Sequence, residues 1–454
     1  MSIKVVVLAA GKGTRMKSSK PKVLHRLAGL PLLKHVLNNV AGLNPEAVIT
    51  VIGHEAGQVV EEIGEACDFV SQEQQKGTGH AVQQATALLA DDDRVLIAYG
   101  DVPLTRPETF QQLLALCSET TIGLLSVTLE NPTGYGRIVR DSAARVVGIV
   151  EEKDASDDQR KIREVNTGML SINGAILKRL LDRIDNNNAQ GEYYLTDIFA
   201  LAEADGLRIE TVSPEFEWEV TGVNSRQQLA ELERIHQANL ADELMQNGVT
   251  LVDPARIDIC GHLSTGNDVE IHVNCVFNGD VELGDNVVVG PNCVISDSRI
   301  GSGTVIQANS VIEKADIGEH NAIGPFARIR PGSKLEANAH IGNFVEIKNS
   351  HIDQGSKVNH LSYVGDADIG KNTNVGAGTI TCNYDGANKH RTVMGDSVFI
   401  GSNSALVAPV RIGDGATIGA GSVISRDVDA NQLALTRAAQ KSINGWQRPQ
   451  KKPK

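Results

Sequence analysis

A glycine turn flanked by basic side chains is the first feature of the sequence that could do chemistry. The segment Leu8–Met16 reads Leu-Ala-Ala-Gly-Lys-Gly-Thr-Arg-Met and follows an apolar run, and Pro21-Lys22 comes shortly after it. Gly11 and Gly13 let the backbone approach a phosphate group, so that its N–H groups can point at the oxygens. Arg15 and Lys22 add positive charge where a diphosphate would leave. The segment predicts chemistry at a phosphorus atom.

Two common phosphate-binding motifs do not fit this turn. A dinucleotide-binding fingerprint needs a third glycine where the chain has Met16, and the Walker ending Gly-Lys-Ser/Thr is missing from it. A carboxylate comes later, in Tyr99-Gly-Asp101, which ends an apolar run. Doubly wound sheets bind ligands at such strand ends, and Mg²⁺ prefers carboxylate oxygens. Asp101 is therefore a candidate magnesium ligand, although taken alone it could be an ordinary turn residue.

A second group of candidate side chains lies between Arg330 and Tyr363. Lys348 follows Arg330 by 18 residues and precedes His360 by 12, and both steps are multiples of six. Two stacked cations would suit a sugar phosphate. A histidine can act as general base near neutral pH, which an amine attacking a thioester requires. Taken alone, His360 would more simply be an exposed turn residue.

The first half of the chain must position the glycine turn. Residues 1 to about 223 show short apolar runs that alternate with longer stretches of helical character. The runs are Val5–Leu8, Val48–Ile52, Val95–Tyr99 and Ile122–Val127. This alternation predicts an α/β doubly wound, Rossmann-like domain with a mostly parallel sheet covered by helices.

A single helix is predicted over residues 225–247. Ser225 and Gln228 form a capping box at its start, and leucines recur at three- and four-residue steps until Asn247-Gly248 ends it. Because the two halves that it joins are so unlike, we expect this helix to be a linker. The predicted domains are 1–226, the linker helix 227–247, and 248–454.

From about residue 250 the apolar residues recur every six positions, a period that fits neither an α-helix nor a simple strand. One run is Ile317, Ile323, Ile329, Leu335, Ile341 and Ile347, and another is Met394, Ile400, Leu406, Ile412, Ile418 and Ile424. The hexapeptide repeat of a parallel β-helix has this period, with three repeats in each triangular coil and the aliphatic residue inside. Known hexapeptide helices are left-handed, and we expect the same here.

The repeat places some of the candidate residues and leaves others open. Arg330 and Lys348 should lie side by side on one face, one coil apart. A five-residue step between Ile347 and Ile352 shifts the phase, so counting does not place His360 on that face. The phase also breaks in the 19 residues between Val375 and Met394. The segment 382–389 should protrude there as a loop, and such loops usually carry function.

Composition limits the classes of partner. The formal net charge is −13, whereas nucleic acid needs a basic surface, so we expect no nucleic-acid partner. The six cysteines are scattered, which predicts neither structural zinc nor a disulfide framework. No apolar stretch approaches the ~20 residues of a membrane span, and the opening apolar run is too short for a signal peptide. We expect a cytoplasmic protein with no membrane partner.

The string Leu8–Met16 with Pro21-Lys22 resembles the sugar-nucleotidyltransferase family. Other segments agree in order: Gln72 and Gly77–His80 resemble its uracil-reading loop, and Asn224 matches its second metal ligand. Pro132–Arg137, Glu151, Glu164–Gly168 and Gln190–Asp197 resemble its sugar-binding segments. With the linker helix and the hexapeptide half, essentially the whole chain resembles the bacterial bifunctional N-acetylglucosamine-1-phosphate uridylyltransferase / glucosamine-1-phosphate N-acetyltransferase family.

This resemblance implies two reactions. The hexapeptide half would acetylate glucosamine 1-phosphate with acetyl-CoA. The first half would then transfer UMP from UTP to the product, giving UDP-GlcNAc and pyrophosphate, with Mg²⁺ bridging the phosphates. The family forms homotrimers, with acyltransferase sites in the grooves between subunits, so a homotrimer is implied here too.

The resemblance also implies the site residues. For uridylyl transfer they are Arg15 and Lys22 as catalytic cations, Leu8, Ala9, Ala10, Gly11, Gln72, Gly77, Thr78, Tyr99, Gly100, Gly136, Glu151 and Asn166 on the nucleotide and sugar, and Asp101 and Asn224 on the metal. For acetyl transfer they are His360 as base, Arg330, Lys348, Tyr363, Asn374 and Lys389 on glucosamine 1-phosphate, and Ala377, Asn383, Tyr384, Ser402, Ala420 and Arg437 on acetyl-CoA.

Two other interpretations remain open from the residues alone. The β-helix could serve only to trimerise or regulate a nucleotidyltransferase. The loop Asn383–Lys389 argues against that, because a scaffold needs no such protrusion. The chain could also be a binding protein without catalysis, but then the grouping of Arg15, Lys22 and Asp101 would be a coincidence.

Overall fold

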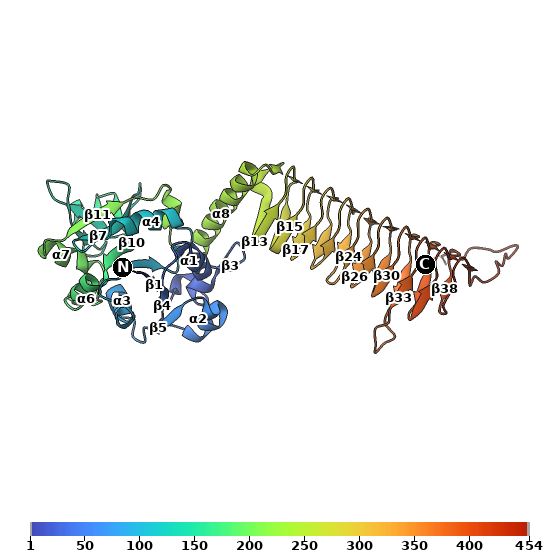
Figure 1. Cartoon of the computed structure of the whole chain (residues 1–454), viewed down its shortest axis with the longest axis horizontal. Coiled ribbons are helices and arrows are strands. Elements are labelled where there is room, and N and C mark those ends of the chain that lie inside the picture. Colours follow the sequence, from blue (N-terminus) through green and yellow to red (C-terminus); the bar gives the residue numbers. More distant parts are fainter. Residues whose placement is uncertain (1, 452–454) are drawn as a thin grey trace. The chain divides into compact units, whose positions relative to one another are not determined.

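The computed structural model describes residues 2–451 and divides into two compact units, Met1–His236 and Gln237–Lys454. The division falls inside helix α8 (Arg226–Gln246), which contributes residues to both units (Figure 1). The three domain ranges given above treat this helix as a separate linker, and those ranges stay a prediction. None of the described helices is long and apolar enough to cross a membrane.

Unit 1 is built on one mixed sheet with the strand order β11-β7-β10-β6-β1-β4-β5, and β8 and β9 extend from β10. The strands are β1 (Ile3–Leu8), β4 (Ala47–Ile52), β5 (Asp68–Ser71), β6 (Arg94–Tyr99), β7 (Thr121–Thr128), β8 (Arg137–Arg140), β9 (Val146–Val150), β10 (Glu164–Asn173) and β11 (Arg208–Val212). A small hairpin, β2 (Arg26–Leu27) and β3 (Leu30–Pro31), stands apart from the sheet. All four apolar runs predicted as strands are therefore strands.

Alternating side chains of the sheet enter two cores, one on each face. Val5 and Val7 of β1 pack with α1, α2 and α4, whereas Val6 and Leu8 pack with α3, α6 and α7. The helices are α1 (Leu32–Ala41), α2 (Ala56–Ile63), α3 (Thr78–Gln83), α4 (Pro107–Leu116), α5 (Asp157–Arg160), α6 (Gly174–Leu181) and α7 (Asp197–Ala204). Burial on both faces explains why β1 reads as an unbroken apolar run instead of an alternating one. The predicted doubly wound α/β fold is confirmed.

The order of the strands reverses between β1 and β6. The chain builds outward from β1 to β4 and β5, and then returns to place β6 against the other edge of β1. Open α/β sheets bind ligands at such a switch point, beyond the carboxyl ends of the strands. Leu8 and Tyr99, the last residues of β1 and β6, are register partners, so the segments that follow them leave the sheet side by side.

Helix α8 begins with a modified cap. Ser225 Oγ accepts a hydrogen bond from Gln228 N at 3.2 Å, as the predicted capping box requires. The Gln228 side chain, however, accepts from Asn224 N at 2.8 Å instead of from Ser225 N. The cap therefore also fixes the backbone of Asn224, which the sequence singled out as a metal ligand.

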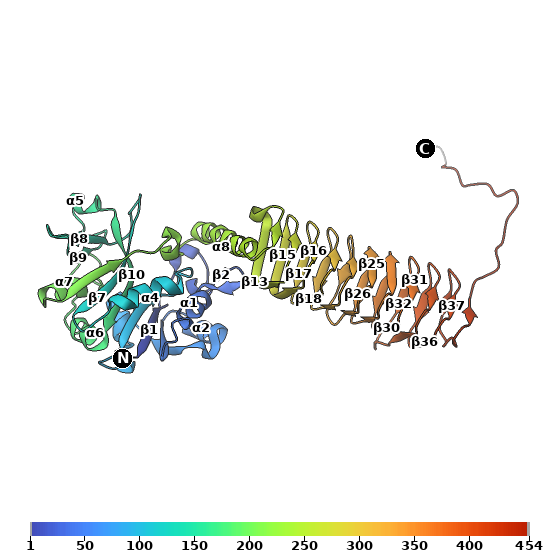
Figure 2. The ribbon, with the colours of Figure 1, turned by 45° about the horizontal axis from the view of Figure 1, so that its top comes forward.

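Unit 2 is a parallel β-helix whose strands stack coil upon coil (Figures 1 and 2). One face is an 11-stranded parallel sheet of β12 (Thr250–Leu251), β14 (Glu270–Ile271), β16 (Val288–Val289), β19 (Val305–Ile306), β22 (Ala322–Ile323), β25 (His340–Asn343), β28 (Lys357–His360), β31 (Asn374–Val375), β34 (Phe399–Ile400), β37 (Thr417–Ile418) and β39 (Leu433–Ala434). The other two faces begin together in the long strands β13 (Ile257–Thr265) and β15 (Cys275–Leu283).

Beyond β15 these two faces separate. The second consists of β17 (Val294–Ser296), β20 (Val311–Glu313), β23 (Arg328–Ile329), β26 (Glu346–Lys348), β29 (Tyr363–Gly365), β32 (Ile380–Cys382), β35 (Ala405–Val407) and β38 (Val423–Ile424). The third consists of β18 (Arg299–Ile300), β21 (Asp316–Ile317), β24 (Lys334–Leu335), β27 (His351–Ile352), β30 (Ala367–Ile369), β33 (Thr392–Met394) and β36 (Val410–Ile412).

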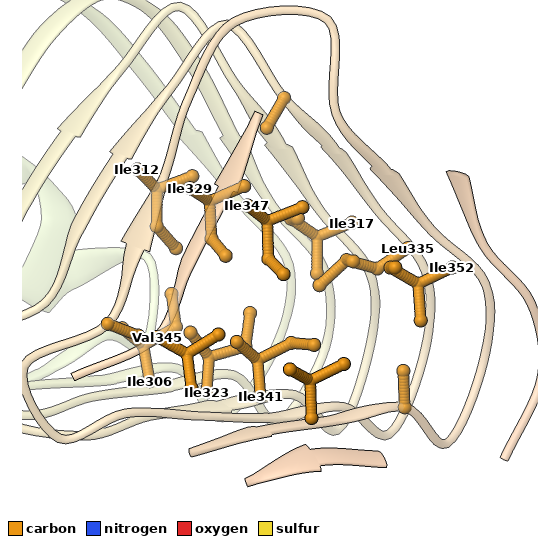
Figure 3. Close-up of a cluster of buried hydrophobic side chains, with 14 of the residues drawn as sticks. Ile306, Ile312, Ile317, Ile323, Ile329, Leu335, Ile341, Val345, Ile347 and Ile352 are labelled. Carbon is orange, nitrogen blue, oxygen red and sulfur yellow. The ribbon is translucent and has the colours of Figure 1, made fainter. Parts of the chain in front are cut away.

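The residues of the six-residue period fill the inside of the coils. None of the twelve residues in the two predicted runs is more than 4% exposed. Figure 3 shows part of this core, including residues of the first run, in three inward-pointing rows, one from each face: Ile312, Ile329 and Ile347; Ile317, Leu335 and Ile352; and Ile306, Ile323 and Ile341. Each isoleucine thus packs on its equivalent in the next coil. The predicted hexapeptide β-helix is confirmed.

The corners of the coils and one loop complete the unit. Asparagine occupies many left-handed corner positions, among them Asn274, Asn292 and Asn309, which also hydrogen-bond to one another through their side chains from coil to coil. Between β32 and β33 the chain leaves the coil as the predicted loop (Figure 1). Tyr384 and Lys389 pair across it, so the loop is a narrow hairpin.

Candidate active sites in the two units

A pocket of about 300 Å³ opens at the switch point of unit 1, where the glycine turn follows β1. Its lining includes the predicted residues Leu8, Ala9, Ala10, Gly11, Lys22, Gln72, Gly77, Thr78, Tyr99 and Asp101. It also includes Val23, Gln75, Ala81 and Glu192. The structure therefore brings most of the predicted nucleotide residues to one place, although they come from five different segments of the chain.

The side of this pocket that would read a base is held by glutamine amides. Gln72 is buried, and its Nε2 donates to Gly77 O at 3.0 Å, so the two predicted base-reading segments are joined. Gln75 Nε2 donates to Ala10 O at 2.7 Å and fixes the loop after β1. Gly77 has a φ of 108°, and a β-carbon there would lie 2.5 Å from Tyr193 O. Only glycine fits this position without displacing the wall of the pocket.

Lys22 stands between the two predicted metal ligands. Its Nζ donates to Asn224 Oδ1 at 2.9 Å and also forms an ion pair with Asp101 Oδ2. The side chains of Lys22 and Asp101 are only 13% and 16% exposed, so this pair is screened from bulk water. Val223 N donates to Asp101 O at 2.9 Å and thereby ties the segment before α8 to the end of β6. Two oxygen atoms from distant parts of the sequence, Asp101 Oδ2 and Asn224 Oδ1, thus converge on the Lys22 ammonium.

Tyr99 separates the pocket from a second group of predicted residues. Burial, with added repulsion from the carboxylates of Glu151 and Asp101, raises the pKa of the Tyr99 phenol above its usual range. A β-carbon on Gly168 would lie 2.5 Å from the Tyr99 ring, which explains the glycine in that segment. Burial also raises the pKa of Glu151, opposed by a hydrogen bond from Thr196. Glu151 is therefore a half-buried carboxylate whose ionised form is disfavoured by burial and supported by Thr196.

Six predicted residues, Glu151 among them, do not line this pocket. Gly136 and Asn166 hydrogen-bond to each other through their backbones at 2.9 Å, next to Glu151. Gly100 is buried beneath the pocket against Ala9, and Asn224 reaches the site only through Lys22. Arg15 has an exposed side chain on the short 3₁₀ helix Thr14–Met16. The structure places Arg15 on the glycine turn but does not place it against Asp101.

The face of unit 2 that carries β23, β26 and β29 holds the second cluster. The register of β23 and β26 pairs Ile329 with Ile347, so Arg330 and Lys348 are neighbours one coil apart, as the six-residue period predicted. Arg330 N donates to Ile347 O at 2.8 Å. Tyr363 begins β29 in the next coil, opposite Glu346. Arg330, Lys348 and Tyr363 thus form a column down one face.

Three cations gather at one edge of this face. Arg330 is paired with Glu346 at 2.8 Å, and Lys348 with Asp366 at 3.2 Å. Lys389 comes from the hairpin loop, and the nearby Lys348 ammonium lowers its pKa, with a further contribution from Arg330. The pKa of an ammonium falls next to other cations because they disfavour its charged form. An anion of two negative charges would relieve this repulsion.

His360 lies at the opposite corner of the same coils. Its Nδ1 donates to Asn343 Oδ1 at 2.8 Å, and the two residues are register partners on β28 and β25. Because Nδ1 carries the proton, Nε2 keeps its lone pair. His360 is exposed, so this lone pair is accessible from outside the coil. The arrangement is that of a histidine ready to accept a proton.

The predicted acetyl-CoA residues continue the corner of His360. Gly378 N donates to His360 O, Asn403 N to Ala377 O, and Gly421 N to Ser402 O, so Ala377, Ser402 and Ala420 occupy equivalent positions in successive coils. Arg437 lies next to Gly419 in the last of these coils. Asn383 is buried at the base of the loop, and Tyr384 is 60% exposed on it. The corner offers a continuous track of small side chains.

One predicted residue does not join the cluster. Asn374 lies on β31, in the sheet that also contains β28, and its register partners there are Lys357 and Phe399. This is a different face of the coil from the one that carries Arg330, Lys348 and Tyr363. Within one chain, the structure does not bring Asn374 together with those three residues.

Sequence reasoning missed three residues that the geometry makes prominent. Asn343 holds His360, Asp366 holds Lys348, and Gln75 lines the pocket of unit 1. Among the described residues, no group of three or more His, Cys, Asp or Glu side chains is arranged to hold a metal ion. The pair of Asp101 and Asn224 supplies two protein ligands at most, which leaves the remaining positions of a cation to other oxygens.

Comparisons with known proteins agree with this division of the chain. The MobA-like NTP transferase domain matches residues 5–162, the GMPPB C-terminal domain residues 259–335, and the bacterial transferase hexapeptide (six repeats) residues 391–426. The solved UDP-glucose pyrophosphorylase complexed with UDP-glucose is 18% identical, with a TM-score of 0.42, over 53% of this chain and 100% of its own.

Relatives match the chain from end to end. Bifunctional protein GlmU of Azoarcus sp. (strain BH72) is 57% identical over 451 residues, covering 99% of this chain and 100% of its own. Bifunctional protein GlmU of Stutzerimonas stutzeri (strain A1501) is 57% identical over 453 residues, covering 100% of both chains. That of Ralstonia nicotianae is 53% identical over 451 residues, covering 99% of both.

A doubly wound NTP transferase unit joined to a hexapeptide-repeat unit defines a two-domain transferase. At this identity and coverage the chain belongs to the Bifunctional protein GlmU family. It is a bifunctional enzyme of UDP-GlcNAc synthesis with uridylyltransferase and acetyltransferase activities.

Proposed function

We propose that the pocket at the switch point of unit 1 is the uridylyltransferase site. The observation that carries this assignment is the convergence of Lys22, Asp101 and Asn224 beside the glycine turn. UTP would lie with its base against Gln72 and Gly77 and its phosphates on the turn. A phosphate oxygen of N-acetylglucosamine 1-phosphate attacks the α-phosphorus, and the bond from that phosphorus to the pyrophosphate oxygen breaks. The Lys22 ammonium stabilises the charge that gathers on the departing pyrophosphate.

The residues of this site fit a magnesium ion. Asp101 and Asn224 present a carboxylate oxygen and an amide oxygen to one cationic group, and these are the hard donors that Mg²⁺ prefers. When bound there with substrate phosphates, the ion would neutralise phosphate charge. The chain's own contribution is to hold the two oxygens in place: the Val223–Asp101 hydrogen bond and the cap of α8 fix the backbone on either side.

We expect Asp101→Ala to lose uridylyl transfer, by at least about a hundredfold in kcat, while acetyl transfer by the same chain is unchanged. Pyrophosphate release and CoA release would be measured on one preparation. His360→Ala is the reciprocal variant. If either substitution abolished both activities in a folded protein, the two assigned sites would not be independent and the assignment would be wrong.

For unit 2 we propose that the acetyltransferase site lies along the face of β23, β26 and β29. Arg330, Lys348 and Lys389 would bind the phosphate of glucosamine 1-phosphate, and the track of Ala377, Ser402 and Ala420 would bind acetyl-CoA. His360 Nε2 takes a proton from the sugar amine as the amine nitrogen bonds to the thioester carbon. The carbon–sulfur bond then breaks, and CoA leaves as the thiol after it receives a proton.

A homotrimer with shared acetyltransferase sites completes this proposal. Asn374 lies on another face from Arg330 and Lys348, so a substrate that touches all three needs faces from two subunits. Next to His360, Phe326, Phe344 and Leu361 form an exposed apolar ladder on one corner. Such a ladder is typical of a surface that packs against another copy. We also propose a cytoplasmic location, since UTP and acetyl-CoA are supplied there.

A further inference from the structure

Asp366 is a buried carboxylate at the edge of the proposed acetyltransferase site. It is 6% exposed, and it occupies the left-handed corner, with φ 49°, directly after β29, the strand that begins with Tyr363. Its backbone N donates to Lys348 O at 2.9 Å, so it lies one coil above Lys348. A buried carboxylate is costly unless its oxygens are paired. The side chains that donate hydrogen bonds to Asp366 therefore indicate its role.

Three side chains donate to this carboxylate, two from consecutive residues of the preceding coil and one from the base of the hairpin loop. Lys348 Nζ lies 3.2 Å from Oδ2, Asn349 Nδ2 lies 2.6 Å from Oδ1, and Asn383 Nδ2 donates to Oδ2. Lys348 is a proposed ligand of glucosamine 1-phosphate, and Asn383 is one of the residues that the family resemblance implies for acetyl-CoA. Asp366 itself has its oxygens occupied by protein donors and offers little to a ligand.

Charge explains why a carboxylate stands here. Lys348, Lys389 and Arg330 lie close enough that cation repulsion lowers the pKa of Lys389. Burial alone would raise the pKa of Asp366, but the donors Asn349 and Asn383 and the Lys348 charge outweigh it and lower that pKa, so the group is ionised. Its negative charge is the counter-charge that keeps Lys348 within the cluster before substrate arrives.

The same carboxylate also holds the base of the hairpin loop. Asn383 O accepts from His390 N at 2.8 Å, so Asn383 bridges Asp366 and the end of the loop. Inside the loop, Asp385 accepts from Asn388 N at 2.6 Å and from His390 at 2.7 Å, which makes the hairpin a defined unit. The loop carries Lys389 and Tyr384. Asp366 thus connects the fixed lysine of the coil with the substrate-binding residues of the loop.

We propose that Asp366 is the positioning residue of the acetyltransferase site, holding the Lys348 ammonium and the Asn383 amide where the two substrates bind. This inference rests on the proposed function of unit 2. It predicts that one substitution weakens the binding of both substrates, because the Asp366 carboxylate holds one residue assigned to each of them.

The test is Asp366→Asn, which keeps the shape of the side chain and removes its charge. We expect the KM values of glucosamine 1-phosphate and of acetyl-CoA each to rise about tenfold, since hydrogen bonds to charged groups contribute this much. Asp366→Glu, which restores the charge, should recover part of both losses. Asp368→Asn is the matched control, because Asp368 lies two residues away and pairs with Arg391 outside the cluster. Circular dichroism and thermal unfolding of the full chain report whether unit 2 is folded in each variant, and uridylyl transfer reports the same for unit 1.

A double-mutant cycle separates positioning from a general loss of structure. In a Lys348→Met background, Asp366→Asn should cost much less glucosamine 1-phosphate affinity than it does alone, since its partner is already gone. Equal costs in both backgrounds, or an Asp366→Asn enzyme that behaves like Asp368→Asn, would overturn the inference. If Lys348→Met and His360→Ala themselves kept full acetyl transfer, the proposed function would fail first.

Discussion

At the scale of single residues, the proposed acetyltransferase site depends on which nitrogen of His360 carries a proton. Asn343 Oδ1 can only accept, and it lies 2.8 Å from Nδ1, so the hydrogen bond selects the tautomer with a free Nε2. Asn343 is held in turn by the strand pairing of β25 with β28. The amide therefore orients the imidazole ring without touching the substrate.

We predict that Asn343→Leu lowers kcat for acetyl transfer about tenfold and leaves the KM values of both substrates within about twofold. Leucine fills the space but cannot accept the Nδ1 proton, so the ring loses its preferred tautomer and orientation. Steady-state CoA release measures both constants. Asn349→Leu, one six-residue repeat further along, provides a contrast, since Asn349 contacts Asp366 and not His360. An Asn343→Leu enzyme with raised KM values and normal kcat would contradict the role given to Asn343.

Residues such as these show where the sequence stops being sufficient. Asn343 precedes His360 by 17 residues and Asp366 follows Lys348 by 18, so each lies one coil from a predicted site residue. The six-residue period predicts that such pairs stack, and it placed Arg330 beside Lys348. It could not select Asn343 or Asp366, because the coil length changes at the step from Ile347 to Ile352. Which corner a residue occupies depends on that change.

At the scale of elements, the pattern of apolar residues predicted the strands, whereas the capping pattern predicted only part of the contacts at the start of α8. Apolar runs predicted the strands of unit 1 because burial on both faces leaves no other pattern. The position of Gly136, Glu151 and Asn166 outside the pocket lining was not predictable, because β10 shifts its register against β7 between Asn166 and Leu170. The start of α8 was predicted, but its side-chain bond to Asn224 was not.

Within unit 1, helix α8 has a pH-dependent contact with α1. The rings of His236 on α8 and His35 on α1 meet edge to face at 5.4 Å, and His35 Nε2 donates to Leu27 O at 2.8 Å. Burial, followed by repulsion from His35, lowers the pKa of His236 to about 4. In the unfolded chain this group titrates near 6.5. At a pH between these two pKa values, His236 is therefore protonated in the unfolded chain and neutral in the folded chain.

We predict that the stability of unit 1 is full above pH 6.5 and falls as the pH drops toward 4, by at most about 3 kcal/mol from this group. His236→Gln should remove that part of the pH dependence. Urea unfolding followed by the fluorescence of Trp218, which packs beside Leu232 of α8, measures it. The exposed His54 supplies the control His54→Gln. If wild type and His236→Gln lost stability in parallel between pH 6.5 and 4, the contact would not carry the effect.

At the scale of the whole molecule, the two activities differ in what they require from other copies of the chain. The described residues that line the pocket of unit 1 all belong to that unit, and the proposed ligands Asp101 and Asn224 both contact Lys22 at its edge. The proposed site of unit 2 includes Asn374 on one face of the coil and Arg330 and Lys348 on another. Uridylyl transfer should therefore survive dissociation of the oligomer, whereas acetyl transfer should not.

The apolar ladder beside His360 allows this difference to be tested. The Phe326 and Phe344 rings stack at 5.1 Å, and Leu361 follows one coil on at 64% exposure. We predict that Phe344→Ser with Leu361→Ser converts the proposed trimer to monomers, removes at least about 90% of acetyl transfer, and leaves uridylyl transfer unchanged, because each subunit loses two large apolar contacts and truncating such an anchor typically costs about 2 kcal/mol or more.

Light scattering coupled to gel filtration gives the mass, and the two product assays give the activities. The matched control is Phe399→Ser with Val423→Ser, since these side chains are 50% and 54% exposed on strand faces and not on the ladder. A ladder variant that remains trimeric, or a monomer that still acetylates glucosamine 1-phosphate at the wild-type rate, would show that the site is complete within a single chain.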